Sequence, residues 1–173
     1  RCLVGSEMCI RDRFLCIGIY FGFSMGLSTP LGYAYGDRNF SVCRVLEKYA
    51  YRFFAIAPII LYGCTYLLAP IGVYFFASPG STVFDMAISG LRLYGLGFLF
   101  SGINIFAAIR MMTYGKGYIS GMITFLRSFA LLLLFLTILP RFLELNGIWL
   151  AVPAAEILTL IVALWTLRKK TVA

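Results

Sequence analysis

Five apolar stretches of 21 to 25 residues fill most of this chain between Phe14 and Leu167. A helix rises about 1.5 Å per residue, so about 20 apolar residues cross the ~30 Å hydrocarbon core of a bilayer. Hydrophobic residues make up 61% of the 173 and charged residues 13%, which excludes an ordinary soluble domain. We therefore predict an all-α, polytopic transmembrane helix bundle. Its spans are residues 14–35, 53–77, 86–109, 118–139 and 147–167.

Residues 1–13 do not share this character, because RCLVGSEMCIRDR is polar and shows no helical period. It also lacks the apolar core and small-residue cleavage site of a signal peptide. We interpret it as a non-native linker of the kind found at the ends of assembled sequence reads, rather than as a native loop. On that interpretation residues 14–173 form one five-helix membrane domain, and the chain is a fragment.

The basic residues between the spans predict the orientation of the bundle. One side of the membrane has a single basic residue, Arg141. The other side collects Arg38, Arg44, Lys48, Arg52, Arg110, Lys116, Arg168, Lys169 and Lys170. Cytoplasmic loops of membrane proteins are enriched in Lys and Arg. We therefore expect loops 36–52 and 110–117 and the C-terminus in the cytoplasm, and loops 78–85 and 140–146 outside the cell membrane.

Turn-forming residues stand at the expected helix ends. Gly36 and Gly115 each follow an apolar run, where a left-handed residue commonly ends a helix. Pro79-Gly80 and Asn146-Gly147 are typical of the two outer turns. Residues 39–52 place apolar side chains at helical spacing opposite several charges, which predicts an amphipathic helix lying along the cytoplasmic interface as a basic anchor.

Small residues and prolines mark how the spans pack and bend. The first span carries Gly18, Gly22 and Gly26 on one face, and the last carries Ala151, Ala155, Thr159 and Ala163. Such faces let helices approach closely. Pro30, Pro58 and Pro153 lie inside spans and Pro70 near the end of one. Proline removes a helical hydrogen bond, so the three interior prolines are candidates for helix bending and gating.

Four ionisable or strongly polar residues within the spans are the functional candidates: Arg92, Asn104, Arg127 and Glu156. A charge at the bilayer centre costs roughly 2.5–3.5 kcal/mol, so these groups should face the bundle interior and have partners. Arg127 and Glu156 lie at similar depths on successive helices, about 15 Å from the same interface, so we predict that they pair. Arg92 lies near the outer end of its span, and we expect it to extend to the headgroups.

Two roles remain open for the predicted pair. Structurally, it neutralises two charges and joins two helices. Functionally, Glu156 binds a proton or sodium ion, with Arg127 tuning its affinity. Asn104 lies mid-span and can either bridge helices or line a cavity. We favour the structural role, because a firm salt bridge holds a carboxylate in its charged form and makes proton uptake harder.

Residues needed for common enzyme and metal sites are missing from the sequence. It contains no histidine, which removes HExxH sites and histidine-activated nucleophiles. Its five cysteines include no CxxC pair, so neither zinc nor a disulfide framework is indicated. We expect no enzyme activity, no metal and no cofactor. We read the basic loops as orienting a membrane protein, so we expect no nucleic-acid partner.

Three motifs in order resemble the multidrug and toxic compound extrusion (MATE) family. Residues 29–36 read TPLGYAYG, similar to the family's PLIGYNYGA at the end of its eighth helix. Residues 100–104 read FSGIN and are followed by GKG at residues 115–117. Residues 147–156 read GIWLAVPAAE. The resemblance covers about residues 14–170.

This resemblance implies helices eight to twelve of a twelve-helix antiporter, a partial C-terminal lobe. Such proteins expel cationic or amphipathic compounds in exchange for sodium ions or protons. The implied partners are the lipid bilayer, a small exported molecule and the missing N-terminal lobe. The resemblance makes Tyr33 and Ser101 candidates for lining the cavity. Ser101 stands where some sodium-coupled members have aspartate, and Ala34 and Asp37 also depart from the family pattern.

Two alternatives remain. A flippase for lipid-linked sugars shares the general architecture, but it favours a cavity with many cationic residues, and the spans carry only Arg92 and Arg127. A small five-helix scaffold or sensor would need a real start near residue 14, where no methionine stands.

Overall fold

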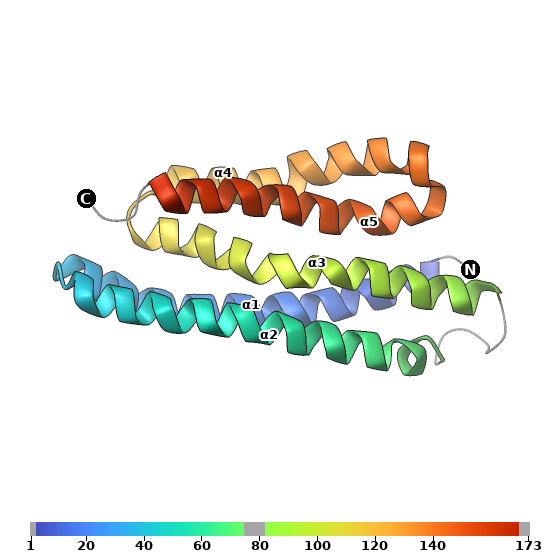
Figure 1. Cartoon of the computed structure of the whole chain (residues 1–173), viewed down its shortest axis with the longest axis horizontal. Coiled ribbons are helices and arrows are strands. Elements are labelled where there is room, and N and C mark those ends of the chain that lie inside the picture. The colour runs from blue at the N-terminus through green and yellow to red at the C-terminus, as the bar shows by residue number, and fades with distance from the viewer. Residues whose placement is uncertain (1–2, 75–81, 170–173) are drawn as a thin grey trace.

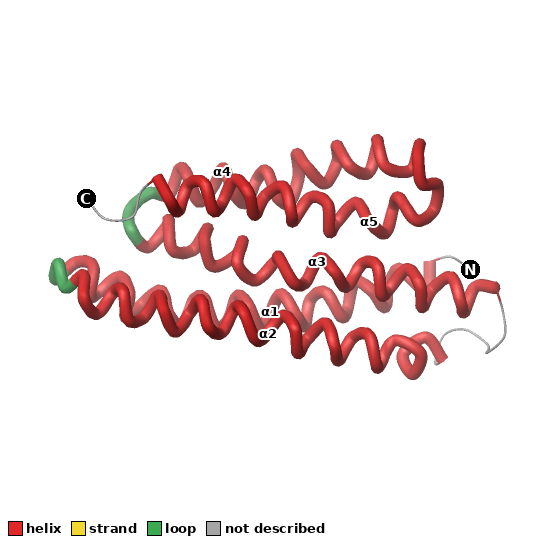
Figure 2. Tube along the Cα trace, viewed as in Figure 1, coloured by secondary structure: helices red, strands yellow, loops and turns green. Residues whose placement is uncertain are grey.

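The computed structural model describes residues 3–74 and 82–169, and these residues are helical apart from short turns (Figure 2). The elements are α1 (Leu3–Gly36), α2 (Phe40–Tyr74), α3 (Thr82–Thr113), α4 (Gly117–Phe125), the π-helical turn η1 (Leu126–Ala130) and α5 (Leu131–Lys169). Five stretches are long and apolar enough to cross a membrane. The predicted all-α, five-span architecture is therefore confirmed.

Helix α3 is the centre of the bundle. It lies between the α1–α2 pair and the hairpin that α4 and α5 form (Figure 1), and it packs against each of them. Most of its apolar window, 72%, is buried, compared with 11–39% for the other four spans. A polar group on α3 is therefore shielded from lipid, and the other spans keep a face that lipid or further protein can cover.

Aromatic side chains fill the contact between α1, α2 and α3. Tyr20, Phe54 and Phe106 are each at most 2% exposed and form one core cluster with Ala50. The Tyr20 hydroxyl donates a hydrogen bond to the carbonyl oxygen of Phe98 at 3.1 Å. A buried hydroxyl needs such a partner, so this bond fixes α1 against α3.

Helix α1 ends with a turn that differs from the prediction. The left-handed residue is Arg38, with φ 55°, and not Gly36. Asn39 N–H donates to Ala34 O at 2.9 Å and Arg38 N–H to Tyr35 O at 3.1 Å. This is the paired bonding of a Schellman motif, which places the left-handed residue next to the last bonded turn. At the end of α3 the prediction is confirmed, because Gly115 has φ 73°.

The segment 39–52 is helical, but its predicted place along the interface is wrong. It forms the first turns of α2, which runs unbroken from Phe40 to Tyr74 (Figure 1). No glycine or proline interrupts the sequence before Pro58, so nothing separates an interfacial helix from the span. The apolar stripe instead faces the bundle, where Cys43 packs against Leu31 and Ala34.

The outer turn between the last two spans also differs from the prediction. The chain reverses at Glu144 (φ 48°, ψ −125°), inside the range of α5, and not at Asn146-Gly147. Gly147 has another role, because a Cβ there would clash with the backbone carbonyl group of Leu139. Only glycine lets the two arms approach this closely. The other predicted outer turn, Pro79-Gly80, lies outside the described residues.

The two predicted packing faces have different outcomes. The face of α5 is confirmed, because Ala151, Ala155 and Ala163 are 0–1% exposed. The glycine face of α1 has no neighbour among the described residues, since a Cβ at Gly18, Gly22 or Gly26 would meet nothing within 4 Å. Helix α1 also extends back to Leu3, and the interpretation of residues 1–13 as a linker stays a prediction.

Candidate functional site

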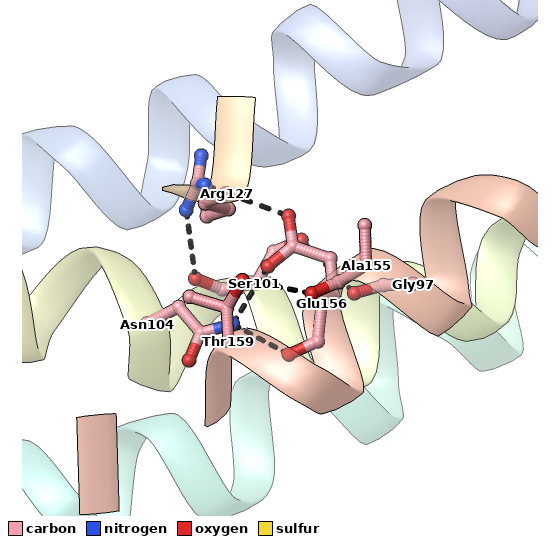
Figure 3. Close-up of polar contacts among 7 residues, drawn as sticks. All are labelled: Gly97, Ser101, Asn104, Arg127, Ala155, Glu156 and Thr159. Atoms are coloured by element: carbon pink, nitrogen blue, oxygen red, sulfur yellow. Dashed lines mark hydrogen bonds and ion pairs between the residues drawn. The ribbon is translucent and has the colours of Figure 1, made fainter. Parts of the chain in front are cut away.

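The most buried polar cluster lies where α3 meets α5. Asn104 of α3 is 0% exposed and Glu156 of α5 is 3% exposed. The Asn104 amide nitrogen Nδ2 donates to Glu156 Oε2 at 2.7 Å and to the backbone carbonyl oxygen of Glu156 at 2.9 Å (Figure 3). One side chain thus holds both the carboxylate and the backbone of the facing helix.

Arg127 completes the cluster from a third element, the π-helical turn η1. Its Nε lies 3.6 Å from Glu156 Oε1, and its Nη1 donates to the carbonyl oxygen of Ser101 at 3.4 Å (Figure 3). The pairing of Arg127 with Glu156 predicted from their depths is therefore confirmed. A π turn inserts one residue into the helix and occurs frequently at functional sites. Here the π turn η1 contains Arg127 itself.

The cluster holds one cation and one anion, and both side chains are largely buried. The Arg127 and Glu156 side chains are 11% and 4% exposed. Each carboxylate oxygen of Glu156 faces a donor, Asn104 on one side and Arg127 on the other. A buried charge left without its partner is strongly destabilising, and here contacts from Asn104 and Arg127 to Glu156 tie α3, η1 and α5 together.

One polar atom of the cluster lacks a hydrogen-bond partner among the described residues. Asn104 Oδ1 is buried and has no hydrogen-bond partner in the described part of the chain. A buried acceptor without a partner is unusual in folded proteins and needs a donor, such as water or a ligand. Asn104 is therefore the residue of the cluster with spare hydrogen-bonding capacity.

A pocket of about 140 Å³ adjoins the cluster between α1, α3, α4 and η1. Asn104 and Arg127 are its most polar lining residues. The remaining lining residues are Phe21, Met25, Ile105, Ala108, Ile109, Met112, Ser120, Ile123 and Thr124. An apolar pocket with a few polar groups is the usual form of a small-molecule site.

The other predicted site residues lie apart from this pocket. Ser101 is buried, and its hydroxyl donates to the carbonyl oxygen of Gly97 at 2.9 Å. Tyr33 is 75% exposed. Neither lines the pocket, and their cavity-lining role stays a prediction.

The helices continue through the three interior prolines. Pro58 is among the fully buried side chains. The Pro153 backbone packs on Gly97, where an added Cβ would lie 3.6 Å from the Pro153 nitrogen. These contacts indicate packing roles for Pro58 and Pro153, and the bending role of Pro30, Pro58 and Pro153 stays a prediction.

Arg92 of α3 contacts an aromatic ring of α2, and its extension to the headgroups stays a prediction. Its guanidinium carbon lies 4.1 Å from the centre of the Tyr66 ring, and its Nε is buried without a hydrogen-bond partner among the described residues. A cation over an aromatic face is attracted by the ring electrons. The side chain is therefore held between α3 and α2 by Tyr66.

A second polar network, which the sequence reasoning missed, joins α2 and α3 near the turns at residues 37–39 and 114–116. Glu47 forms an ion pair with Arg110 and accepts a hydrogen bond from the Tyr114 hydroxyl at 2.5 Å. Burial, together with the bond to Glu47, raises the pKa of Tyr114. A signal was present, because Glu47 follows Cys43 by four residues and so lies on the apolar stripe.

Metal-ligating side chains do not gather among the residues that the structure describes. No group of three His, Cys, Asp or Glu residues occurs there. Cys16, Cys43 and Cys64 form no disulfide with one another. The polar chemistry in the described spans therefore rests on carboxylate, amide, hydroxyl and guanidinium groups.

Comparisons with known proteins identify the fold. No protein-family model matches the sequence, and no curated protein matches it. Among solved structures, an outward-facing multidrug resistance MATE family transporter of the MOP superfamily has a TM-score of 0.83 and 22% identity, covering 96% of this chain and 39% of that one. The MATE transporter VcmN of Vibrio cholerae, in its bent form, has a TM-score of 0.84 and 20% identity, covering 95% and 37%.

An inward-facing MATE family transporter of the MOP superfamily matches equally well, with a TM-score of 0.82 and 21% identity, covering 95% of this chain and 40% of that one. The chain thus has the fold of part of a MATE transporter and spans about two fifths of each of these relatives. It is a multi-pass membrane protein with a transporter fold.

Proposed function

We propose that this chain is the C-terminal portion of a secondary active antiporter of the MATE type. The whole protein would expel cationic or amphipathic compounds in exchange for protons or sodium ions. The observation that carries this proposal is the fold likeness, which extends over nearly the whole chain and includes outward-facing and inward-facing transporters. A protein that alternates between two such states, and couples the change to an ion gradient, can move a solute against its own gradient.

The buried cluster of Asn104, Arg127 and Glu156 supports a transport role for the bundle. Charged groups inside a membrane are costly and commonly mark ion or substrate pathways. Both carboxylate oxygens of Glu156 already face partners, so we assign the ion pair a structural role, in which it holds α3, η1 and α5 as one rigid unit. Asn104, with its open acceptor beside the pocket, is then the candidate for contact with a transported ion or solute.

The cytoplasmic orientation of the C-terminus and residence in the cell's inner or plasma membrane belong to the same proposal. The turns at residues 37–39 and 114–116 and the last turns of α5 lie at one end of the bundle (Figure 1). Outside residues 1–13, nine of the ten basic residues that the sequence places in loops and the C-terminal tail are predicted for that side of the membrane. The enrichment of Lys and Arg in cytoplasmic loops supports the assignment.

The test needs the complete reading frame that contains this chain. The encoded protein would be reconstituted in liposomes, and movement of a cationic dye would be followed after imposing a proton or sodium gradient. We expect dye movement that requires one of the gradients and stops when an ionophore collapses it. A frame that begins within the present residues, or gradient-independent flipping of a lipid-linked sugar in place of dye movement, would overturn the proposal.

A Glu156→Gln variant separates the two roles of the ion pair in the same assay. Glutamine keeps an oxygen for Asn104 but cannot exchange a proton or neutralise a sodium ion. Normal insertion with full transport rate would remove the coupling role. Arg141→Gln is the control. It also changes the net charge by one, but at an exposed position away from the buried cluster.

A further inference from the structure

The outer face of the first turns of α2 carries a strip of cations, Arg44, Lys48 and Arg52. They are spaced four residues apart, so they line one side of the helix over about 12 Å. All three are exposed. A groove of about 420 Å³ runs along them and is completed by Glu47, Tyr51 and Ala55.

The positive charge of this groove is not neutralised by a carboxylate from residues 3–74 or 82–169. Its one carboxylate, Glu47, is engaged by Arg110 and Tyr114 on the side of α3. Among the described residues, none of the three cations forms an ion pair with a carboxylate. Arg44 uses its Nε for the carbonyl oxygen of Phe40 at 3.3 Å. The groove therefore offers charged donors to an anion from outside the chain.

The same face of α2 turns apolar one turn further on. Ile56 and Ile59 are 59% and 65% exposed. Ile59 follows Lys48 by eleven residues, which is about three helical turns, so the two side chains point the same way. The cations end at Arg52 and the uncharged membrane stretch begins at Phe53. A ligand on this face meets positive charge at one end and bare aliphatic side chains at the other.

We propose that this groove is a binding site for an anionic phospholipid. The lipid phosphate lies among Arg44, Lys48 and Arg52, and its acyl chains run along Ile56 and Ile59. Basic pockets at the cytoplasmic ends of membrane helices are suited to acidic headgroups. A free phosphate would use the cations but gain nothing from the isoleucines, so the combination selects a lipid. The site goes beyond transport and depends only on the placement of α2 in a bilayer.

The test measures lipid binding to the full-length protein in neutral detergent. Native mass spectrometry with dioleoyl-phosphatidylglycerol and dioleoyl-phosphatidylcholine gives the apparent affinity of each lipid. We expect the anionic lipid to bind more tightly. Because each cation near a lipid surface contributes roughly a fivefold factor, Lys48→Gln/Arg52→Gln should weaken binding of the anionic lipid roughly 25-fold. The matched control, Arg38→Gln/Lys116→Gln, removes the same charge outside the groove and should retain the affinity.

Three results would overturn the proposal. Equal affinity of the unaltered protein for the two lipids would remove the charge selection, and this comparison needs no variant to fold. Equal losses in both double variants would leave only a general effect of net charge. Inorganic phosphate that displaces the anionic lipid at low millimolar concentration would assign the groove to a soluble anion. Loss of transport with lipid selectivity intact would count against the proposed function alone.

Discussion

Replacing Arg127 by methionine tests whether the buried ion pair holds the bundle together. Methionine fills a similar volume but carries no charge. In the variant, Glu156 keeps the amide of Asn104 as a donor and loses its only close cation among the described residues. The carboxylate is then held at 3% exposure beside an apolar pocket.

The expected loss follows from the geometry. At the 3.6 Å separation of Nε and Oε1, a charge pair in an effective dielectric of about 20 interacts by roughly 5 kcal/mol. Measured losses on removing one partner of a buried pair are about 3–5 kcal/mol. An ordinary interhelical hydrogen bond in a membrane averages only about 0.6 kcal/mol. We therefore expect Arg127→Met to lower the unfolding free energy by about 3 kcal/mol.

The assay is reversible unfolding of the full-length protein in mixed micelles, followed by the loss of helical signal. The double variant Arg127→Met/Glu156→Leu removes both charges and should recover to within about 1 kcal/mol of the unaltered protein. Arg141→Met, exposed at the other end of the bundle, is the matched control. If Arg127→Met costs less than about 1 kcal/mol, or if the double variant is no better than the single, the reasoning fails.

Three further predictions concern packing, titration and orientation. Gly147→Ala forces a Cβ against the backbone carbonyl group of Leu139, so the variant should lower the melting temperature, whereas Gly121→Ala, with nothing within 4 Å, should leave it unchanged or higher. Because burial raises the pKa of Tyr114, its hydroxyl should stay protonated above pH ~10, where exposed tyrosines ionise. In an ultraviolet titration, the unaltered protein and Tyr114→Phe should therefore show the same tyrosinate absorbance at pH ~10. A lower absorbance of Tyr114→Phe at that pH would contradict the raised pKa. In a background without other cysteines, a membrane-impermeant thiol reagent should label Arg141→Cys from outside and Lys116→Cys only after permeabilisation, and the reverse pattern would invert the proposed orientation.

Part of the polar cluster could be predicted because helical rise converts residue number into depth. Arg127 and Glu156 lie at similar depths on successive helices, and their pairing followed from that alone. Asn104 lies on a different helix, and depth does not say which neighbour it faces. Its bonds to Glu156 depend on the rotation of α3 about its axis. That rotation is set by the packing of the whole bundle.

The errors have a common physical origin. The sequence places turns where glycine occurs, as at Gly36 and Asn146-Gly147, but the left-handed residues are Arg38 and Glu144. A non-glycine residue adopts this conformation when the surrounding bonds and packing compensate its strain. Gly147 is needed for a close backbone approach, which local sequence does not reveal.

The sequence by itself determined that this protein lies in a lipid bilayer and that its membrane spans are helices. Apolar stretches of 21 to 25 residues are longer than the strands of a membrane barrel and are expected to be helices, in which each backbone polar group finds its partner within the segment. That choice is local and can be read along the chain. Only the tertiary structure decided that α3 is central, that η1 carries Arg127 to Glu156, and that Glu47 meets Arg110. These contacts join residues distant in sequence, and they depend on how each helix is rotated against its neighbours, which no local pattern contains.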